Sequence, residues 1–235
     1  MATDLTGDLK LVLKDALKLL QALVDVISSQ GWLRPALACM ELSQMVVQGM
    51  WDKDPAMLQV PHTSRDTLAR LAACNPPVTS VFGILEMEDE DREAALQVTE
   101  AQMSDVATFC NAYPSIDLTF ELTDAEGATA VSGEAVGVTV TLQRDVDEED
   151  EEDMASLGKV VSARYPHAKQ EAWWLMVGDT NTNSMLTIKR VTVGAASRVK
   201  LSFDAPELPG DYKLTLYLCS DSYVGCDQEY DLPLT

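Results

Sequence analysis

The chain has 235 residues, and its 38 Asp and Glu residues outnumber its 17 Lys and Arg residues, which gives a net charge of −21. Phosphate binding relies on clustered Lys and Arg, so this balance argues against nucleic-acid binding by the whole chain and favours a basic protein partner. The hydrophobic fraction of 46% argues against general disorder. The sequence shows neither a secretory signal nor an apolar run of the roughly 20 residues that span a membrane, so we expect a soluble protein without membrane contact.

Two long helices are predicted at the start of the chain. Apolar residues recur at three- and four-residue spacing from Asp8 to about Ser29, with charged residues on the other side. Gly31 then serves as a left-handed cap. A second helix carries Pro35 in its first turn and is apolar on most faces until Asp52, so we expect it to be buried among other helices.

Several short helices are predicted next. Thr63 or Ser64 can cap the first of them, and Asn75-Pro76-Pro77 ends it. A short apolar helix at 81–87 precedes an acidic run. Duplex-binding helical hairpins present backbone amides to phosphate at their turn, and prolines have no amide to offer, so this segment is not expected to bind a duplex.

The last predicted helix begins with a capping box formed by Thr99 and Gln102 and ends at Tyr113-Pro114. We place the boundary between helices and strands there, because the apolar period changes from about 3.6 to 2 beyond it. The predicted division is a helical bundle, a helix-loop-helix and a sandwich, at residues 1–60, 61–113 and 114–235.

Seven short strands without intervening helices predict an antiparallel β-sandwich after the helices, and therefore an α+β fold. The predicted strands are 116–122, 136–142, 173–177, 185–193, 199–203, 212–218 and one that includes Tyr230 and Leu232. Eight of the nine residues at 145–153 are acidic, which predicts a mobile, solvated loop, with a docking site for a basic partner as the alternative.

No catalytic, metal-binding or cofactor-binding residues are predicted. His62 and His167 lie in different halves, each beside a proline, without the close spacing of a zinc site, and we expect both in surface loops. Phosphate-loop, dinucleotide-binding and nucleophile-elbow motifs are missing. The five cysteines include no CxxC pair, which predicts free thiols in a reducing compartment, with a Cys219–Cys226 bridge as the less favoured alternative.

Six residues are candidates for a partner surface: Trp174, Met176, Lys189, Arg190, Arg198 and Lys200. On a strand, Trp173 and Trp174 point to opposite faces, so Trp173 is expected inside the sandwich and Trp174, with Met176, on its outer face. There the two side chains are either covered by the helical half or available to a partner. The four cations are expected to form a basic spot across neighbouring strands or simply a solvated face.

Three stretches resemble one family: residues 30–37 leading to Met50-Trp51, residues 171–179, and the long pattern at 217–230. They are similar to the Sec-sixty-three homology unit, shared by an endoplasmic reticulum translocation protein and by large helicases with tandem cassettes. The resemblance is strongest to the C-terminal cassette of spliceosomal RNA helicases. It implies a fibronectin type III-like or immunoglobulin-like sandwich after the helices.

The resemblance also implies a function: a non-catalytic, nuclear protein-interaction module that binds the remainder of a parent helicase and other spliceosomal proteins. An RNA-contacting element that assists strand separation is the alternative, although RNA contact is expected to be weak. The family unit begins with a winged helix and early bundle helices, whereas this sequence starts late in the bundle. We therefore expect the apolar face of the first helices to need a partner.

Overall fold

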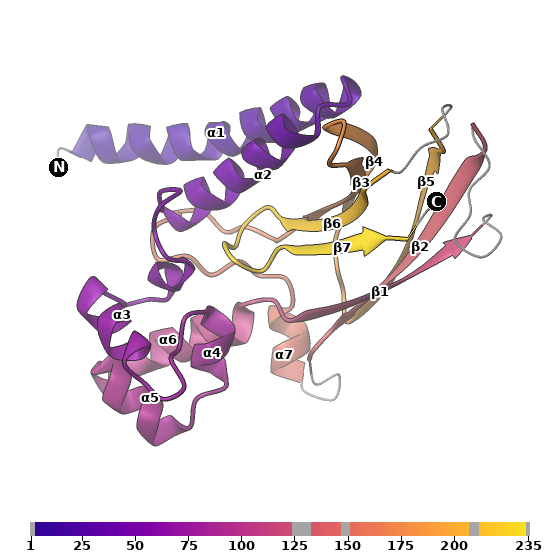
Figure 1. The fold of residues 1–235 in the computed structure, drawn as a ribbon. Coiled ribbons are helices and arrows are strands. Elements are labelled where there is room, and N and C mark those ends of the chain that lie inside the picture. The colour runs from indigo at the N-terminus through magenta and orange to yellow at the C-terminus, as the bar shows by residue number, and fades with distance from the viewer. Residues whose placement is uncertain (1–2, 124–132, 147–150, 207–211, 234–235) are drawn as a thin grey trace.

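The computed structural model describes residues 3–123, 133–146, 151–206 and 212–233. The helices precede the strands, apart from one short helix between β2 and β3 (Figure 1). Their bounds are α1 Thr3–Ser29, α2 Leu33–Gln48, a 3-10 helix Ala56–Gln59, α3 Arg65–Ala72, α4 Val81–Leu85, α5 Asp89–Leu96, α6 Glu100–Ala112 and α7 Glu151–Ser156. None of these helices, within the described residues, is both long and apolar enough to cross a membrane.

All seven predicted strands are present. They are β1 Ile116–Thr123, β2 Ala135–Arg144, β3 Trp173–Asp179, β4 Ser184–Val191, β5 Ala196–Asp204, β6 Leu214–Ser220 and β7 Gln228–Leu232. They form two antiparallel sheets with the orders β1-β2-β5 and β4-β3-β6-β7. Strands such as β1 and β5 show alternating burial, which is a local signal, whereas β3 and β6 are buried along their whole length. The α+β class is confirmed.

The helix caps follow the sequence closely. Gly31 adopts a left-handed conformation with φ of 70° after α1. Ser64, the second of the two proposed caps, accepts a hydrogen bond from the Thr67 amide at the start of α3. The capping box of Thr99 and Gln102 at α6 is confirmed, since both of its hydrogen bonds are present. Local chemistry therefore fixes where these helices begin and end.

One acidic segment forms a helix where no structure was predicted, and a second acidic segment differs from its prediction. The acidic run forms α5, with Asp89, Glu90 and Asp91 in its first turn, where negative charge is stabilised by the helix dipole. Residues 151–153 belong to α7 rather than to a loop, so the loop prediction is wrong there; residues 147–150 lie outside the described part of the chain.

Two hydrophobic clusters hold the molecule together. The larger cluster fills the space between the sheets and continues into α3 to α6, so Val140 and Leu216 of the strands share it with Ile84 and Phe109 of the helices. The smaller cluster lies between the outer face of the four-stranded sheet and helices α1 and α2, which lie along that sheet in Figure 1. The three-domain division stays a prediction, because the larger cluster runs across its proposed boundary at Tyr113.

Candidate interaction surfaces

Trp174 and Met176 lie on the outer face of β3 beneath α1 and α2. Trp174 is 2% exposed and Met176 is 0% exposed. Both belong to the cluster that contains Val24 of α1 with Leu33 and Met40 of α2. Cover by the helical half, one of the two alternatives for these side chains, is therefore confirmed. The other alternative is wrong, because neither side chain is available to a partner at this surface.

Arg190 on β4 lies over the ring of Trp174. Its guanidinium carbon lies 4.8 Å from the centroid of the Trp174 ring. Its Nη2 donates a hydrogen bond to Oδ2 of Asp221 at 2.6 Å. A cation over an indole face and an ion pair with a buried carboxylate both engage the guanidinium within the molecule. Arg190 therefore supports packing more than it offers a free cation.

The four candidate cations do not form one basic spot across neighbouring strands. Lys189 and Arg190 lie on β4 and point to opposite faces, whereas Arg198 and Lys200 lie on β5 of the other sheet. On β5, Val199 and Leu201 point into the core. Arg198 and Lys200 alternate with them and therefore face away from the core, on the outer face of the three-stranded sheet. The predicted spot is wrong because strands adjacent in sequence belong to different sheets.

The connection between β6 and β7, residues 221–227, contains a buried ion cluster. Oδ1 of Asp221 accepts hydrogen bonds from Nζ of Lys169 at 2.6 Å and from the Ala172 amide at 3.0 Å. With Arg190 on Oδ2, one carboxylate that is 1% exposed faces two cations. Burial lowers the pKa of Lys169, and the Asp221 charge opposes that decrease. The cluster joins the 159–172 segment to β4 and β6.

Two glutamines of α2 attach this helix to the β6–β7 connection. Nε2 of Gln44 donates to the Ser220 carbonyl at 2.9 Å and to Oδ2 of Asp227 at 2.8 Å. Nε2 of Gln48 donates to the Ser222 carbonyl at 2.8 Å. Loss of water around the carboxyl group raises the pKa of Asp227 to about 6, and hydrogen bonds from Gln44 and the Ser220 amide offset part of the rise.

A third glutamine and two tyrosines complete the joint. Gln59 exchanges two hydrogen bonds with the backbone of Val224, donating at 2.7 Å and accepting at 3.1 Å. Tyr113 donates to the Val224 carbonyl at 3.0 Å, and the Tyr223 hydroxyl accepts from the Val161 amide at 2.8 Å. The long pattern at 217–230 therefore has a structural explanation, since it satisfies polar groups where the helices meet the sandwich.

The reactive side chains are engaged in structural contacts. Nε2 of His62 lies 2.7 Å from Oδ2 of Asp105, and Nε2 of His167 lies 2.9 Å from the Lys10 carbonyl. All five cysteines are free, and burial raises the pKa of the Cys219 and Cys226 thiols, which makes them unreactive. Within the described ranges, no group of three or more His, Cys, Asp or Glu residues is placed to hold a metal ion.

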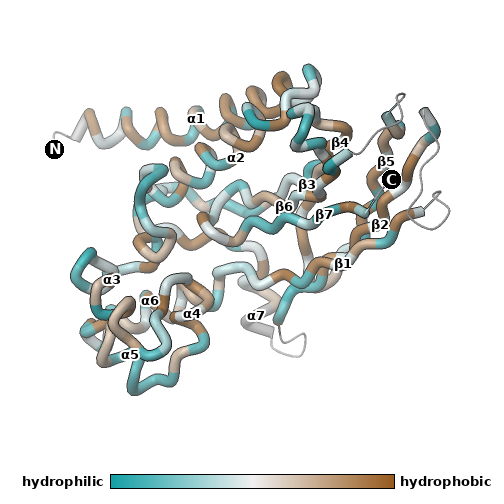
Figure 2. The backbone as a smooth tube through the Cα atoms, viewed as in Figure 1, coloured by the Kyte–Doolittle hydropathy of each residue, from teal (hydrophilic) through white to brown (hydrophobic). Residues whose placement is uncertain are grey.

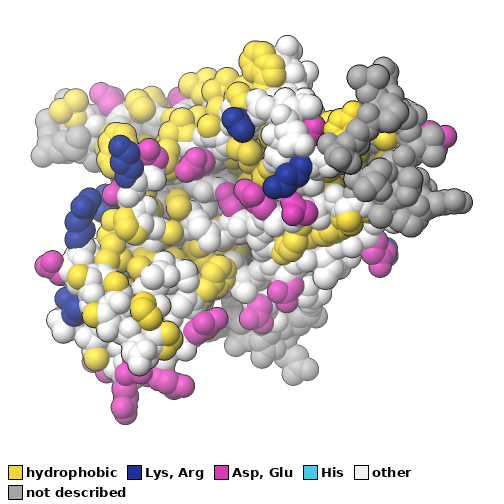
Figure 3. Space-filling model, in the orientation of Figure 1, with side chains coloured by type: hydrophobic (Ala, Val, Ile, Leu, Met, Phe, Trp, Pro, Cys, Tyr) yellow, Lys and Arg dark blue, Asp and Glu magenta, His cyan; other side chains and the backbone are white. Residues whose placement is uncertain are grey.

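An exposed apolar stripe runs along α1, where the sequence analysis expects an apolar face that needs a partner. The side of α1 that faces the molecule is buried at Leu17, Val24 and Ile27. Next to this buried side around the helix, large apolar side chains that are 44% to 70% exposed alternate at spacings of three and four residues: Leu5, Leu9, Val12, Leu19, Leu23 and Val26, with Ala16 between the third and fourth. Figures 2 and 3 show hydrophobic residues along the whole helix.

This second stripe, called the α1 stripe below, was readable in the sequence. The sequence analysis treats the apolar residues from Asp8 to Ser29 as one face, whereas the structure divides them into a buried set with Val24 and Ile27 and an exposed set with Leu9 and Leu23. Following each series of three- and four-residue steps along α1 separately would have distinguished the two sets of apolar residues. An apolar stripe at alternating spacing of three and four is the pattern with which one helix packs against another.

Comparisons with known proteins match residues 1–233 to the Sec63 Brl domain. The chain is 49% identical over 229 residues to the DExH-box ATP-dependent RNA helicase DExH12 of Arabidopsis thaliana, an alignment that covers 97% of this chain and 10% of that protein. It is 46% identical to the U5 small nuclear ribonucleoprotein 200 kDa helicase of Drosophila melanogaster and 45% identical to that of Homo sapiens, each over 98% of this chain and 10% of the relative. The chain therefore spans about one tenth of the length of these relatives.

Proposed function

Because the chain belongs to the Sec63 Brl domain family, we propose that it is a non-catalytic accessory and protein-interaction module of a spliceosomal RNA helicase. It acts in pre-mRNA splicing in the nucleus, and its partners are the remainder of the parent helicase and other spliceosomal proteins. The names of the relatives, an ATP-dependent RNA helicase and U5 small nuclear ribonucleoprotein helicases, support this assignment. Nucleotide hydrolysis belongs to other parts of the parent.

The α1 stripe is the observation that carries the interaction function. Soluble proteins rarely leave a contiguous apolar surface of this length uncovered, and its spacing suits a second helix. The occupant that we propose is a helix from the remainder of the parent helicase. This choice is supported by the length of the relatives, of which the chain spans about one tenth.

We propose that the chain is non-catalytic because the side chains of its main buried charge clusters are paired with one another. Asp221 is neutralised by Lys169 and Arg190, and Glu171 pairs with Arg144 in the interior. The alternative function, an RNA-contacting element that assists strand separation, has less support because the candidate cations are divided between the two sheets. We also propose a fibronectin type III-like or immunoglobulin-like sandwich, supported by the three- and four-stranded antiparallel sheets.

The α1 stripe is tested with the double variant Leu19→Glu and Val26→Glu, which places two charges where a helix is proposed to dock. We expect binding to a parent helicase that lacks this segment to weaken at least tenfold, since an unpaired charge in an apolar interface costs more than about 1.4 kcal/mol. The measurement is the equilibrium dissociation constant by biolayer interferometry.

Charges on the opposite, solvated face of the same helix serve as the control. Lys14→Glu and Lys18→Glu together should leave the dissociation constant unchanged, because both residues are exposed on the charged side of α1, away from the α1 stripe. Equal weakening by both pairs, or by neither, would contradict docking through the α1 stripe. Tight, salt-sensitive binding of RNA by the chain alone would favour the alternative function.

A further inference from the structure

A groove opens between the C-terminal end of α2 and the β6–β7 connection. It has a volume of about 340 Å³, and Leu37 and Met45 of α2 supply apolar surface in its wall. Figure 3 shows Asp and Glu side chains gathered over the middle of the face on which α2 and β6 lie. The groove is separate from the α1 stripe, because no residue of α1 lines it.

Trp51 lines this groove and is 79% exposed, more than any other large apolar side chain among the described residues. Its position is fixed by the turn that follows α2. The Trp51 amide donates to Oδ2 of Asp54 at 3.0 Å, and the Asp54 amide donates to the Trp51 carbonyl at 3.0 Å. These hydrogen bonds fix the backbone at Trp51, and the indole is largely exposed, which is unusual for the largest apolar side chain.

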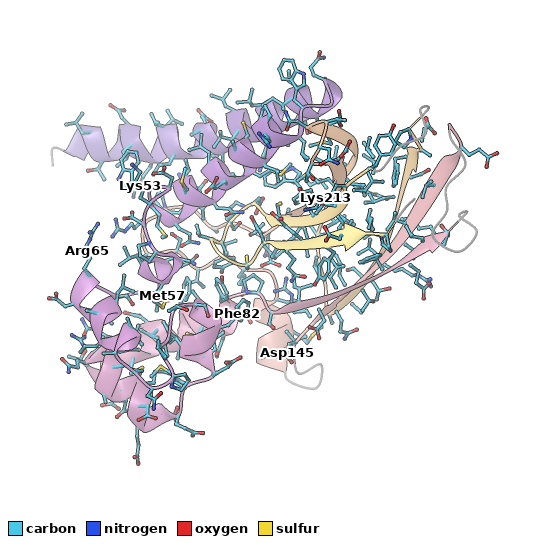
Figure 4. All side chains as sticks on the ribbon, viewed as in Figure 1. Lys53, Met57, Arg65, Phe82, Asp145 and Lys213 are labelled. Carbon is cyan, nitrogen blue, oxygen red and sulfur yellow. The ribbon has the colours of Figure 1, made fainter. Side chains whose placement is uncertain are left out.

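Five carboxylates line the groove beside Trp51, and no Lys or Arg is among its lining residues. Two of the five have partners: Asp227 accepts from Gln44, and Asp54 lies 3.8 Å from Nη2 of Arg65. The other three, Glu41, Asp52 and Glu229, are exposed, and none of the described cations pairs with them. Lys53 and Arg65 lie on this side of the molecule, near the connection from α2 to α3 (Figure 4).

We propose that the groove binds an arginine side chain of a basic protein segment. A guanidinium group is planar, so it stacks on an indole face and also donates paired hydrogen bonds to a carboxylate. A lysine ammonium group provides the charge without the planar fork, and it is more strongly hydrated. RNA is a poor occupant, since five carboxylates repel its phosphates.

This inference rests on the proposed function, for which it supplies the chemistry of one docking site. The two can fail independently, because the α1 stripe and the groove lie on different elements. Binding of the parent helicase through α1 does not require Trp51, and binding of an arginine peptide does not require Leu19 or Val26.

The test uses the whole chain and a fluorescein-labelled, amidated peptide of sequence Gly-Ser-Arg-Gly-Arg-Ser-Gly, with its two-lysine counterpart. Fluorescence anisotropy gives the dissociation constants at moderate salt. We expect the arginine peptide to bind more tightly than the lysine peptide. Trp51→Leu should weaken arginine binding about two- to fivefold, the range for a cation over an exposed aromatic ring.

Matched variants separate the groove from general attraction by an acidic protein. Trp32→Leu removes another exposed indole, 54% exposed, and should leave binding unchanged. Asp52→Asn with Glu229→Gln should weaken binding about two- to fivefold, whereas Glu90→Gln with Asp117→Asn, which removes the same charge elsewhere, should have no effect. An unchanged thermal midpoint in each variant shows that it is folded.

Three results would overturn the proposal. The first is no binding of the arginine peptide, and the second is equal affinity for the lysine peptide. The third is equal weakening by the two pairs of charge variants, which would mean that net charge rather than the groove attracts the peptide. Any of these results, combined with intact docking of the parent helicase, would rule out arginine binding in the groove and leave the proposed function in place.

Discussion

Asp221 shows how one residue can organise the contact between distant segments. Its carboxylate accepts from Lys169, from Arg190 and from the Ala172 amide, and Arg190 in turn lies over Trp174. Taking these charges out of water is unfavourable, so the cluster is stable only while every member keeps its partner. The packing of Trp174 under α2 therefore depends on a carboxylate more than 40 residues away in sequence.

We predict that Asp221→Asn destabilises the protein by about 3 kcal/mol, because it leaves two cations without their shared counter-charge. The side-chain oxygen of the variant can still accept a hydrogen bond from the Ala172 amide. The loss of stability therefore measures the effect of removing the negative charge. Urea unfolding followed by circular dichroism measures it. Asp117→Asn, an exposed position on β1, is the control and should change stability by less than about 0.5 kcal/mol. A loss from Asp221→Asn below about 1 kcal/mol would contradict the role given to this cluster.

At the scale of elements, the approach of α2 to β3 is unusually close. A Cβ atom on Gly178 would lie 2.7 Å from both terminal carbons of Leu33, which is 1% exposed. The strand register shifts between Val177 and Gly178, where β3 turns beneath the start of α2. Leu33 cannot retreat without moving its buried neighbours, so glycine is needed here for space.

We predict that Gly178→Ala destabilises the protein by about 1–3 kcal/mol through overpacking. In a Leu33→Ala background the same change should cost less, because the truncated side chain leaves room for the new methyl group. A double-mutant cycle by urea unfolding measures this coupling. Gly7→Ala is the control: a Cβ atom there meets nothing within 4 Å, so the change should stabilise α1 by up to about 1 kcal/mol. Additive effects at Gly178 and Leu33 would contradict the proposed clash.

The elements show how far sequence reasoning reaches. Caps, turn residues and short apolar runs depend on neighbours in the chain, so Ser64, the Thr99 box and all seven strands could be predicted. The basic spot failed because the assignment of β4 and β5 to different sheets depends on partners far away in sequence. For the same reason the sequence did not show which apolar stripe of α1 is buried, since either one could face the molecule.

At the scale of the whole molecule, charge is the dominant feature. The net charge of −21 means that exposed carboxylates repel one another across the surface, which opposes the compact state. The buried pairs of Asp221 are screened little by salt, whereas the surface repulsion is screened strongly. Salt should therefore mainly weaken the repulsion between exposed carboxylates.

We predict that raising sodium chloride from about 0.01 M to about 0.1 M stabilises the protein, because the screening length falls from about 30 Å to about 10 Å. A gain of about 1 kcal/mol corresponds to a rise of about 2–4 °C in the thermal midpoint for a chain of this size. Differential scanning calorimetry measures it. Potassium and choline chloride should give the same rise if screening is responsible. A midpoint that falls with salt would mean that attractive surface pairs outweigh the repulsion.

The core that α3 to α6 share with the two sheets has a mechanical consequence. Phe109 and Tyr113 of the helical half make edge-to-face contacts with Tyr223 of the sandwich at centroid separations of 5.9 Å and 5.4 Å, so the passage from α6 into β1 is braced by aromatic packing. Two proteins seated at opposite ends of this module would be kept at a constant span and orientation. The module would then hold its neighbours in a larger assembly at a fixed separation. Substitutions that loosen the aromatic contacts would make that separation variable.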